Sequence, residues 1–292
     1  MKVTGAVQPF LPLCQRLLPS RLAGLSVALL KATALEIAIL AGHLLLYPSG
    51  IAQERRAPIS PLPAPEGTAQ LPTEAKPPVV LLHGFIDNRS VFVLLRRSLA
   101  QHGRQQVESL NYSPLTCDIR TAAELLGRHI EEICARTGSG QVDIVGHSLG
   151  GLIARYYVQR LGGDLRVRTL VTLGTPHSGT RVAPLANAHP IVRQMRPGSE
   201  LLEELTRPAP GCRTHFVSFW SDLDHLMDPL ETACIDHPDL SAQNVRVSGV
   251  GHLALPVHPA VATGIRQVLD TARTEAEAEA EADTRAGGLT VA

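Results

Sequence analysis

A serine between two glycines ends a short apolar run near the middle of the chain. The segment Gly146-His147-Ser148-Leu149-Gly150 follows the apolar residues 142–145 and precedes a stretch with helical spacing. At such a strand-to-helix turn a serine is raised out of the sheet, and a side chain at either glycine would collide with the neighbouring strand or helix. The turn also directs the Leu149 amide, at the start of the helix, to where an oxyanion would form. The pattern predicts a nucleophile at Ser148.

The chain contains 24 glycines, so this five-residue pattern could also occur by chance in a loop. The elements around it decide between a nucleophile and a chance match. Strands and helices alternate around it. We expect strands at 79–82, 107–112, 141–145, 167–173, 214–220 and 244–247, and helices at 89–103, 119–135, 149–161 and 259–272. This alternation predicts an α/β fold with a doubly wound, mostly parallel sheet that binds ligands at the carboxyl ends of its strands.

The first of these strands ends in His83-Gly84-Phe85. Gly84 allows the backbone to turn close to the predicted site, which makes the amide of Phe85 a candidate second oxyanion donor. We interpret His83 as a structural histidine that holds this loop by hydrogen bonds, because a second general base has no evident task there.

An acid and a base follow the last two predicted strands. Three acids lie within residues 221–229. From spacing alone Asp222 and Asp224 are equally suited to orient a histidine, with Asp228 less so. His252 follows the final strand on a glycine-containing loop that is able to fold back over the sheet. The order serine, acid, histidine is one of the known orders of a catalytic triad.

Four motifs together resemble the bacterial triacylglycerol lipases and esterases of the α/β-hydrolase superfamily, over about residues 77–270. The motifs are Val80-Leu81-Leu82-His83-Gly84-Phe85, Gly146-His147-Ser148-Leu149-Gly150-Gly151, Gly174-Thr175-Pro176-His177-Ser178-Gly179-Thr180 and Gly249-Val250-Gly251-His252. The resemblance implies a hydrolase of lipid esters that needs no metal or other cofactor. An acyltransferase or a phospholipase with the same triad is an alternative, and an inactive, tethered binding module is another.

Carried over by position, the resemblance makes Ser148 the nucleophile and His252 the general base. The acid of this family lies in a Ser-x-x-Asp context, which favours Asp224 and leaves Asp222 as the alternative. Phe85 and Leu149 would supply the oxyanion amides.

Residues 180–211 interrupt the alternation of strands and helices. Prolines punctuate this segment around a helix-like stretch, Ser199–Leu205. It is either the wall or lid of a substrate pocket or a surface excursion without a catalytic role.

The N-terminal segment, residues 1–47, is strongly apolar from Leu22 to Tyr47 but carries Lys31, Glu36 and His43. Its length suits a membrane anchor, which we favour. A cleaved export signal and an amphipathic helix packed on the domain are the alternatives. An anchor or an export signal would place the catalytic domain outside the cytoplasm, on the membrane or exported.

Residues 48–76 are rich in proline and predict an extended tether, residues 77–270 form the predicted catalytic domain, and 271–292 form an acidic tail of low complexity.

Charge and cysteine content limit the possible partners. Lys plus Arg and Asp plus Glu both total 27, so a nucleic-acid partner is not indicated. The five cysteines form no Cys-x-x-Cys pair, which argues against a structural zinc site. If the domain is exported, a disulfide between Cys212 and Cys234 would stabilise the loop that carries the acid.

Overall fold

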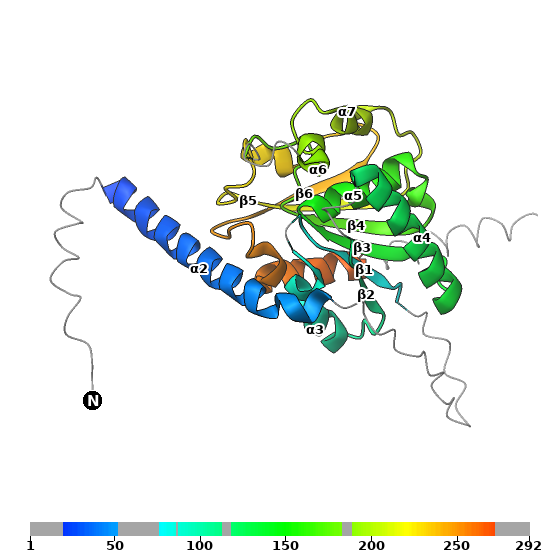
Figure 1. The fold of residues 1–292 in the computed structure, drawn as a ribbon, viewed down its shortest axis with the longest axis horizontal. Coiled ribbons are helices and arrows are strands. Elements are labelled where there is room, and N and C mark those ends of the chain that lie inside the picture. The colour runs from blue at the N-terminus through cyan, green and yellow to red at the C-terminus, as the bar shows by residue number, and fades with distance from the viewer. Residues whose placement is uncertain (1–19, 52–75, 86, 113–117, 183–188, 272–292) are drawn as a thin grey trace, which may run out of the picture.

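The computed structural model describes residues 20–51, 76–85, 87–112, 118–182 and 189–271 (Figure 1). In chain order its helices and strands are α2 (Ser20–Ile51), β1 (Val79–Leu82), the 3₁₀ helix η1 (Arg89–Phe92), α3 (Val93–Gln101), β2 (Val107–Leu110), α4 (Ile119–Thr137), β3 (Val142–His147), α5 (Leu149–Arg160), η2 (Gly163–Leu165), β4 (Val167–Leu173), α6 (Pro190–Gln194), α7 (Glu200–Thr206), β5 (His215–Ser221), η3 (Leu230–Ala233), β6 (Ser241–Val247) and η4 (Leu255–Val257). A final helix covers residues 259–271.

The strands form a single sheet in the order β2-β1-β3-β4-β5-β6, and every neighbouring pair is parallel. The chain leaves β1 for one edge of the sheet through β2 and then returns to the other side of β1 through β3. The direction of winding therefore reverses between β1 and β3, where parallel sheets of this type bind ligands. The predicted doubly wound, mostly parallel sheet is confirmed.

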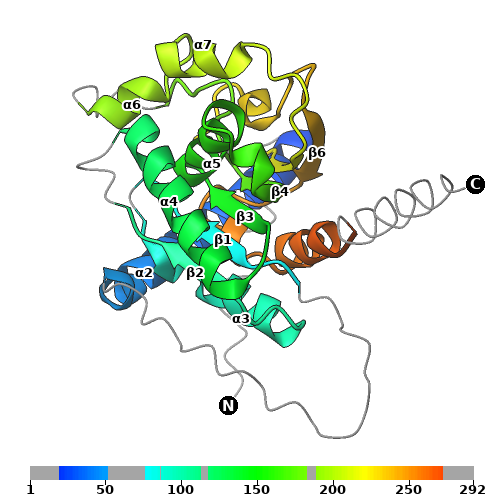
Figure 2. The ribbon, with the colours of Figure 1, turned by 90° about the vertical axis from the view of Figure 1, so that its right-hand side faces the viewer.

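Helices cover both faces of this sheet, with α4 and α5 on one face and α3 and the helix at 259–271 on the other (Figure 2). A hydrophobic core lies on each face. Residues of β1 alternate between them: Val80 and Leu82 pack with α4 and α5, whereas Val79 and Leu81 pack with α3 and the helix at 259–271. A strand that is buried on both faces needs apolar residues at every position, which explains the continuous apolar run of β1.

Helix α4 illustrates how local sequence signals set the ends of an element. Its N-cap Asp118 accepts a hydrogen bond from the Thr121 amide (2.8 Å), and it ends at Gly138, which has the left-handed backbone (φ 71°) typical of a helix C-cap. The buried positions repeat every three to four residues and face the sheet: Ile119, Ala122, Ala123, Leu126, Ile130, Ile133 and Cys134.

Helix α2 packs across the domain beside η1 (Figure 1). It continues through Pro48 to Ile51, so its end lies inside the predicted tether. Its more buried positions, Glu36, Ile39, His43 and Gly50, share one stripe of the helix, as a helix packed on a domain requires.

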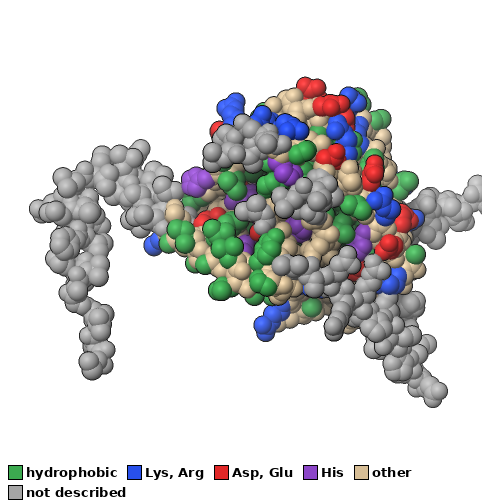
Figure 3. All heavy atoms as spheres, viewed as in Figure 1, with side chains coloured by type: hydrophobic (Ala, Val, Ile, Leu, Met, Phe, Trp, Pro, Cys, Tyr) green, Lys and Arg blue, Asp and Glu red, His purple; other side chains and the backbone are tan. Residues whose placement is uncertain are grey.

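The outer side of α2 keeps large hydrophobic side chains in contact with solvent, including Leu44 (66% exposed) and Leu45 (82% exposed) (Figure 3). None of the helices in the described part of the chain combines the length and apolar character needed to cross a membrane, so the predicted anchor is not supported. The contacts agree with the alternative of a helix packed on the domain. Residues 1–19, most of the predicted tether (52–75) and the tail from 272 onward lie outside the described residues.

The predicted disulfide between Cys212 and Cys234 is wrong, because both cysteines are free. Each belongs to a different local structure. Cys212 packs against the core that contains α4 and α5, whereas Cys234 caps η3 through a hydrogen bond from its amide to the Glu231 carbonyl (2.8 Å).

A buried cluster of charges connects three elements at the amino end of the sheet. Asp143 of β3 is completely buried and contacts two arginines. Arg168 of β4 donates to both of its carboxylate oxygens (3.0 and 2.7 Å), and Arg104, which precedes β2, donates to one of them (3.0 Å). Two guanidinium groups compensate for the removal of this carboxylate from water.

We predict that Asp143→Asn lowers the free energy of unfolding by about 3 kcal/mol, because it leaves two arginines without their buried counter-ion. Urea unfolding followed by circular dichroism measures the change. Glu131→Gln is the matched control: its ion pair with Arg166 is exposed (54% and 39%), and the unfolding midpoint should hardly move. Equal midpoints for both variants would contradict the stabilising role of the Asp143 cluster.

Candidate active site

Ser148 lies at the sharp turn between β3 and α5. Its backbone angles are φ 53° and ψ −119°, and it is the only residue other than glycine with a positive φ in the part of the chain that the structure describes. Two hydrogen bonds hold this conformation: the Ser148 amide donates to the Leu173 carbonyl (2.9 Å), and the Ser148 carbonyl accepts from Thr175 Oγ1 (2.9 Å). The strained turn thus joins β3 to the end of β4.

The two glycines of the motif stand where no side chain fits. A Cβ at Gly146 would lie 2.6 Å from the Gly151 amide nitrogen, and one at Gly150 would lie 2.3 Å from the Leu82 carbonyl oxygen. Both contacts are with backbone atoms, which cannot move aside without shifting β1 or α5. The predicted steric requirement for glycine at both positions is confirmed.

The loop after β1 lies beside this turn because the two strands are in register. Leu82 pairs with Gly146, so both strands end at the same level. Beyond that level, a Cβ at Gly84 would lie 3.5 Å from the Cβ of Ser148. Phe85 follows directly, and Leu149 is the first residue of α5. The two predicted oxyanion donors thus belong to the two segments that adjoin Ser148.

Asp224 and His252 form a buried pair at the same edge of the sheet. His252 Nδ1 donates to Asp224 Oδ2 (2.8 Å), with side-chain exposures of 5% and 0%. Burial disfavours the charged imidazole, but the Asp224 carboxylate outweighs this effect and raises the pKa of His252. The lack of a side chain at Gly174 leaves room for the Asp224 carboxylate, since a Cβ there would lie 2.8 Å from Asp224 Oδ2.

Asp222, the alternative acid, makes other contacts. It accepts hydrogen bonds from the Gly249 amide and from Arg246 Nη2, both at 2.9 Å. Partial burial would raise the pKa of Asp222, but these two donors hold it below its usual value. The carboxylate that binds His252 is therefore that of Asp224, the residue in the Ser-x-x-Asp context that begins at Ser221.

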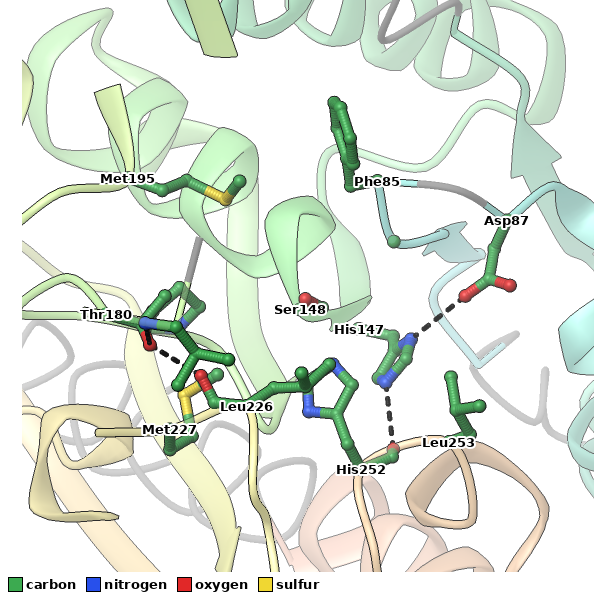
Figure 4. Close-up of a pocket in the computed structure, with 13 residues that line it drawn as sticks. Phe85, Asp87, His147, Ser148, Thr180, Met195, Leu226, Met227, His252 and Leu253 are labelled. Atoms are coloured by element: carbon green, nitrogen blue, oxygen red, sulfur yellow. Dashed lines mark hydrogen bonds and ion pairs between the residues drawn. The ribbon is translucent and has the colours of Figure 1, made fainter. Parts of the chain in front are cut away.

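The bond to Asp224 fixes the tautomer of a neutral His252. With the proton on Nδ1, the lone pair is on Nε2, which is then free to accept a proton. Ser148 and His252 line the same pocket (Figure 4). Its apolar lining is formed by Phe85, Val182, Met195, Leu226, Met227 and Leu253. No group of three His, Cys, Asp or Glu side chains among the described residues is arranged to hold a metal ion.

The segment predicted as a wall, lid or surface excursion contributes to this pocket. It contains the short helices α6 and α7, and Met195, at the end of α6, lines the cavity. The helix-like stretch Ser199–Leu205 corresponds to α7 (Glu200–Thr206), and Ser199 is its N-cap. From α5, the buried Arg155 donates to the carbonyls of Leu205 (3.3 Å) and His177 (3.2 Å), and burial lowers its pKa to about 10. In the described part of the segment, Met195 at the end of α6 therefore contributes to the pocket wall, and α7 is fixed to α5 through Arg155.

Two histidines of the motifs have roles outside the triad pattern. His83 shares a hydrogen bond with the Gly84 carbonyl (2.9 Å) and stacks on Tyr112 (ring centroids 4.3 Å apart), as expected for a structural residue. His147 was not predicted to contribute. Its Nε2 donates to the carbonyl of His252 (3.1 Å), and its Nδ1 lies 3.7 Å from Asp87 (Figure 4). The motif marks only the glycines and the serine, and no other sequence signal points to His147 or Asp87.

Comparisons with known proteins relate part of the chain to one fold family. Residues 77–207 match the family model described as the α/β hydrolase fold. A triacylglycerol lipase of Pseudarthrobacter phenanthrenivorans is 32% identical over 114 residues, which cover 36% of this chain and 35% of that protein. A triacylglycerol lipase of Vibrio cholerae is 31% identical over 142 residues, which cover 46% and 41%. The chain thus matches less than half of the length of these curated relatives.

Among solved structures, a mature lipase of Bacillus licheniformis has a TM-score of 0.57 at 16% identity, covering 75% of this chain and 96% of that chain. At this identity the likeness shows the fold alone. Together, the sheet, the family model and the curated relatives confirm the predicted α/β-hydrolase fold and the resemblance to bacterial lipases.

We predict that Gly150→Ala lowers the free energy of unfolding by about 2 kcal/mol, because the new methyl group would overlap the Leu82 carbonyl. Urea unfolding measures the change. Gly140→Ala is the control, since a Cβ at Gly140 meets no atom within 4 Å. If both variants unfold at the wild-type midpoint, the turn does not depend on the close contact between Gly150 and the Leu82 carbonyl.

Proposed function

We propose that the chain hydrolyses carboxylic esters, with Ser148 as the nucleophile, His252 as the general base and Asp224 as the acid that orients the base. Residues 77–207 match the family model of the α/β hydrolase fold, and the parallel sheet agrees with that match. The proposal is supported above all by the buried bond of 2.8 Å between Asp224 and His252, next to a pocket that Ser148 also lines.

In the first half of the proposed reaction, Ser148 attacks the ester carbonyl while His252 Nε2 takes its proton. The negative charge that develops on the carbonyl oxygen is stabilised by the amides of Phe85 and Leu149. The position of Leu149 at the start of α5 favours an anion there, because helix N-termini carry unpaired amides and a partial positive charge. The protonated His252 then gives its proton to the alcohol, which leaves.

In the second half, water attacks the acyl group on Ser148. His252 accepts a proton from the water and returns it to the Ser148 oxygen as the acid is released. Asp224 orients His252 and stabilises the imidazolium, and this agrees with the raised pKa of His252.

The pocket lining supports esters with an apolar acyl group as substrates. Phe85, Met195 and Leu226 come from three separate segments, and each adds an apolar surface to the pocket. The curated relatives are triacylglycerol lipases, which favours lipid esters within this class. A series of nitrophenyl esters from short to long acyl chain, together with emulsified triacylglycerol, tests this choice directly.

We predict that Ser148→Ala abolishes hydrolysis of nitrophenyl esters and labelling by a fluorophosphonate probe, because both need the serine oxygen. The unfolding midpoint should not fall. Ser178→Ala, at an exposed serine of a neighbouring motif, is the control and should keep both the activity and the label. Hydrolysis at the wild-type rate by Ser148→Ala would rule out the proposed nucleophile.

We predict that Asp224→Asn lowers kcat by about 10⁴-fold, because an amide no longer selects the productive tautomer of His252 or stabilises its charge. The wild-type kcat/KM falls as the pH drops through the raised pKa of His252, since the imidazolium cannot accept a proton. Loss of the carboxylate lowers this pKa, so the acid limb of the variant should move to lower pH. Asp222→Asn is the matched control and should keep most of the wild-type kcat. A larger fall in kcat for Asp222→Asn than for Asp224→Asn would make Asp222 the acid in place of Asp224.

A further inference from the structure

We propose that Glu36 of the N-terminal helix α2 is a positioning residue for the general base: its carboxylate holds the loop that carries His252. The inference rests on the proposed function and extends the catalytic unit to an element outside the sheet and its flanking helices.

The contacts between Glu36 and the loop are direct. Glu36 Oε2 accepts a hydrogen bond from the Leu253 amide (3.0 Å), and Oε1 accepts one from the Ala254 amide (2.9 Å). These are the two amides that directly follow His252. A Cβ at Gly251 would lie 2.4 Å from the carboxyl carbon of Glu36. The carboxylate therefore occupies space that a side chain on this loop would otherwise fill.

Helix α2 is itself fixed to the domain, so Glu36 is presented from a docked element. Ile39, one turn further along, packs against the core that contains α3. At the end of the helix, Asn88 Nδ2 donates to the Tyr47 carbonyl (2.9 Å), and Asn111 Nδ2 donates to the Gly50 carbonyl (2.7 Å). Side chains of the domain thus bind carbonyls near the C-terminal end of α2 and fix this end to the domain.

The loop of His252 is held at successive points by different elements. Asp224 binds the imidazole, His147 donates to the His252 carbonyl (3.1 Å), and Glu36 accepts from the two following amides. Catalysis by proton transfer depends on the position of the base within a fraction of an ångström. Loss of the hydrogen bonds to Glu36 should therefore reduce kcat, although Glu36 itself does not touch the substrate.

Four titratable side chains surround the imidazole of His252. Asp224 follows β5, Glu36 lies on α2, Asp87 follows β1 and His147 ends β3, with its ring 4.8 Å from that of His252. Burial lowers the pKa of His252, and the carboxylates of Asp224, Glu36 and Asp87 raise it. Removal of the charge at Glu36 alone should therefore lower this pKa.

The test is Glu36→Gln in the full-length chain. We expect kcat for a nitrophenyl ester to fall about 10- to 100-fold with little change in KM, because the base is misplaced and the pocket is intact. The acid limb of kcat/KM should move to lower pH. Glu36→Asp keeps the charge but is one methylene too short to bind both amides, so kcat should fall while the acid limb moves less.

Ile37→Gln is the matched control, because Ile37 is the next residue on the helix and 63% exposed. It should behave as wild type. A Glu36→Gln variant with a lower melting temperature but with wild-type kcat and acid limb would overturn the inference, since a purely structural role moves stability alone. If Glu36→Gln does not fold, wild-type kcat in Glu36→Asp overturns it equally.

NMR titration of the His252 imidazole separates this inference from the proposed function. A wild-type chain without esterase activity would contradict the proposed function. The titration would still test Glu36: a lower pKa of His252 in Glu36→Gln supports the contact, and an unchanged pKa contradicts it.

Discussion

The backbone of Ser148 is the constraint on which the rest of the site depends. A non-glycine residue in this conformation costs about 1–3 kcal/mol and persists only where its surroundings leave no alternative. Here β1, β4 and α5 all contact the turn directly. Gly146 and Gly150 allow backbone to approach within distances that no side chain permits, and Thr175 binds the Ser148 carbonyl. The sheet order that puts β1 beside β3 is thus also what keeps the serine raised.

Each end of the sheet has a buried carboxylate, but the two carboxylates have different kinds of partner. At the amino end, Asp143 is neutralised by Arg104 and Arg168, whose charges are permanent, and the result is a fixed structural cluster. At the carboxyl end, Asp224 has His252 as its partner, and the charge of an imidazole comes and goes near neutral pH. The same kind of burial therefore stabilises the fold at one end and supports proton transfer at the other.

Sequence patterns predicted the sheet well because each signal was local. The apolar runs of β1 and β4 mark the observed strand ends, and the glycines around Ser148 mark the turn. Asp224 and Asp222 were not separable by spacing, because the turn after β5 decides which carboxylate faces His252. Glu36 was visible only as a break in an apolar stretch, and no sequence signal linked it to its partner Leu253, which lies 217 positions away.

The prediction for α2 shows a different limit. Apolar composition alone favoured a bilayer, but two of the three residues that interrupted the apolar pattern, Glu36 and His43, face the domain. They are polar because their partners are backbone amides and Asp87 rather than hydrocarbon. The separation between Glu36 and its partners also has a consequence for synthesis. Helix α2 is synthesised before the loop that it holds, because Leu253 follows Glu36 by 217 positions. The contact between them therefore forms only after all strands from β1 to β6 have been made.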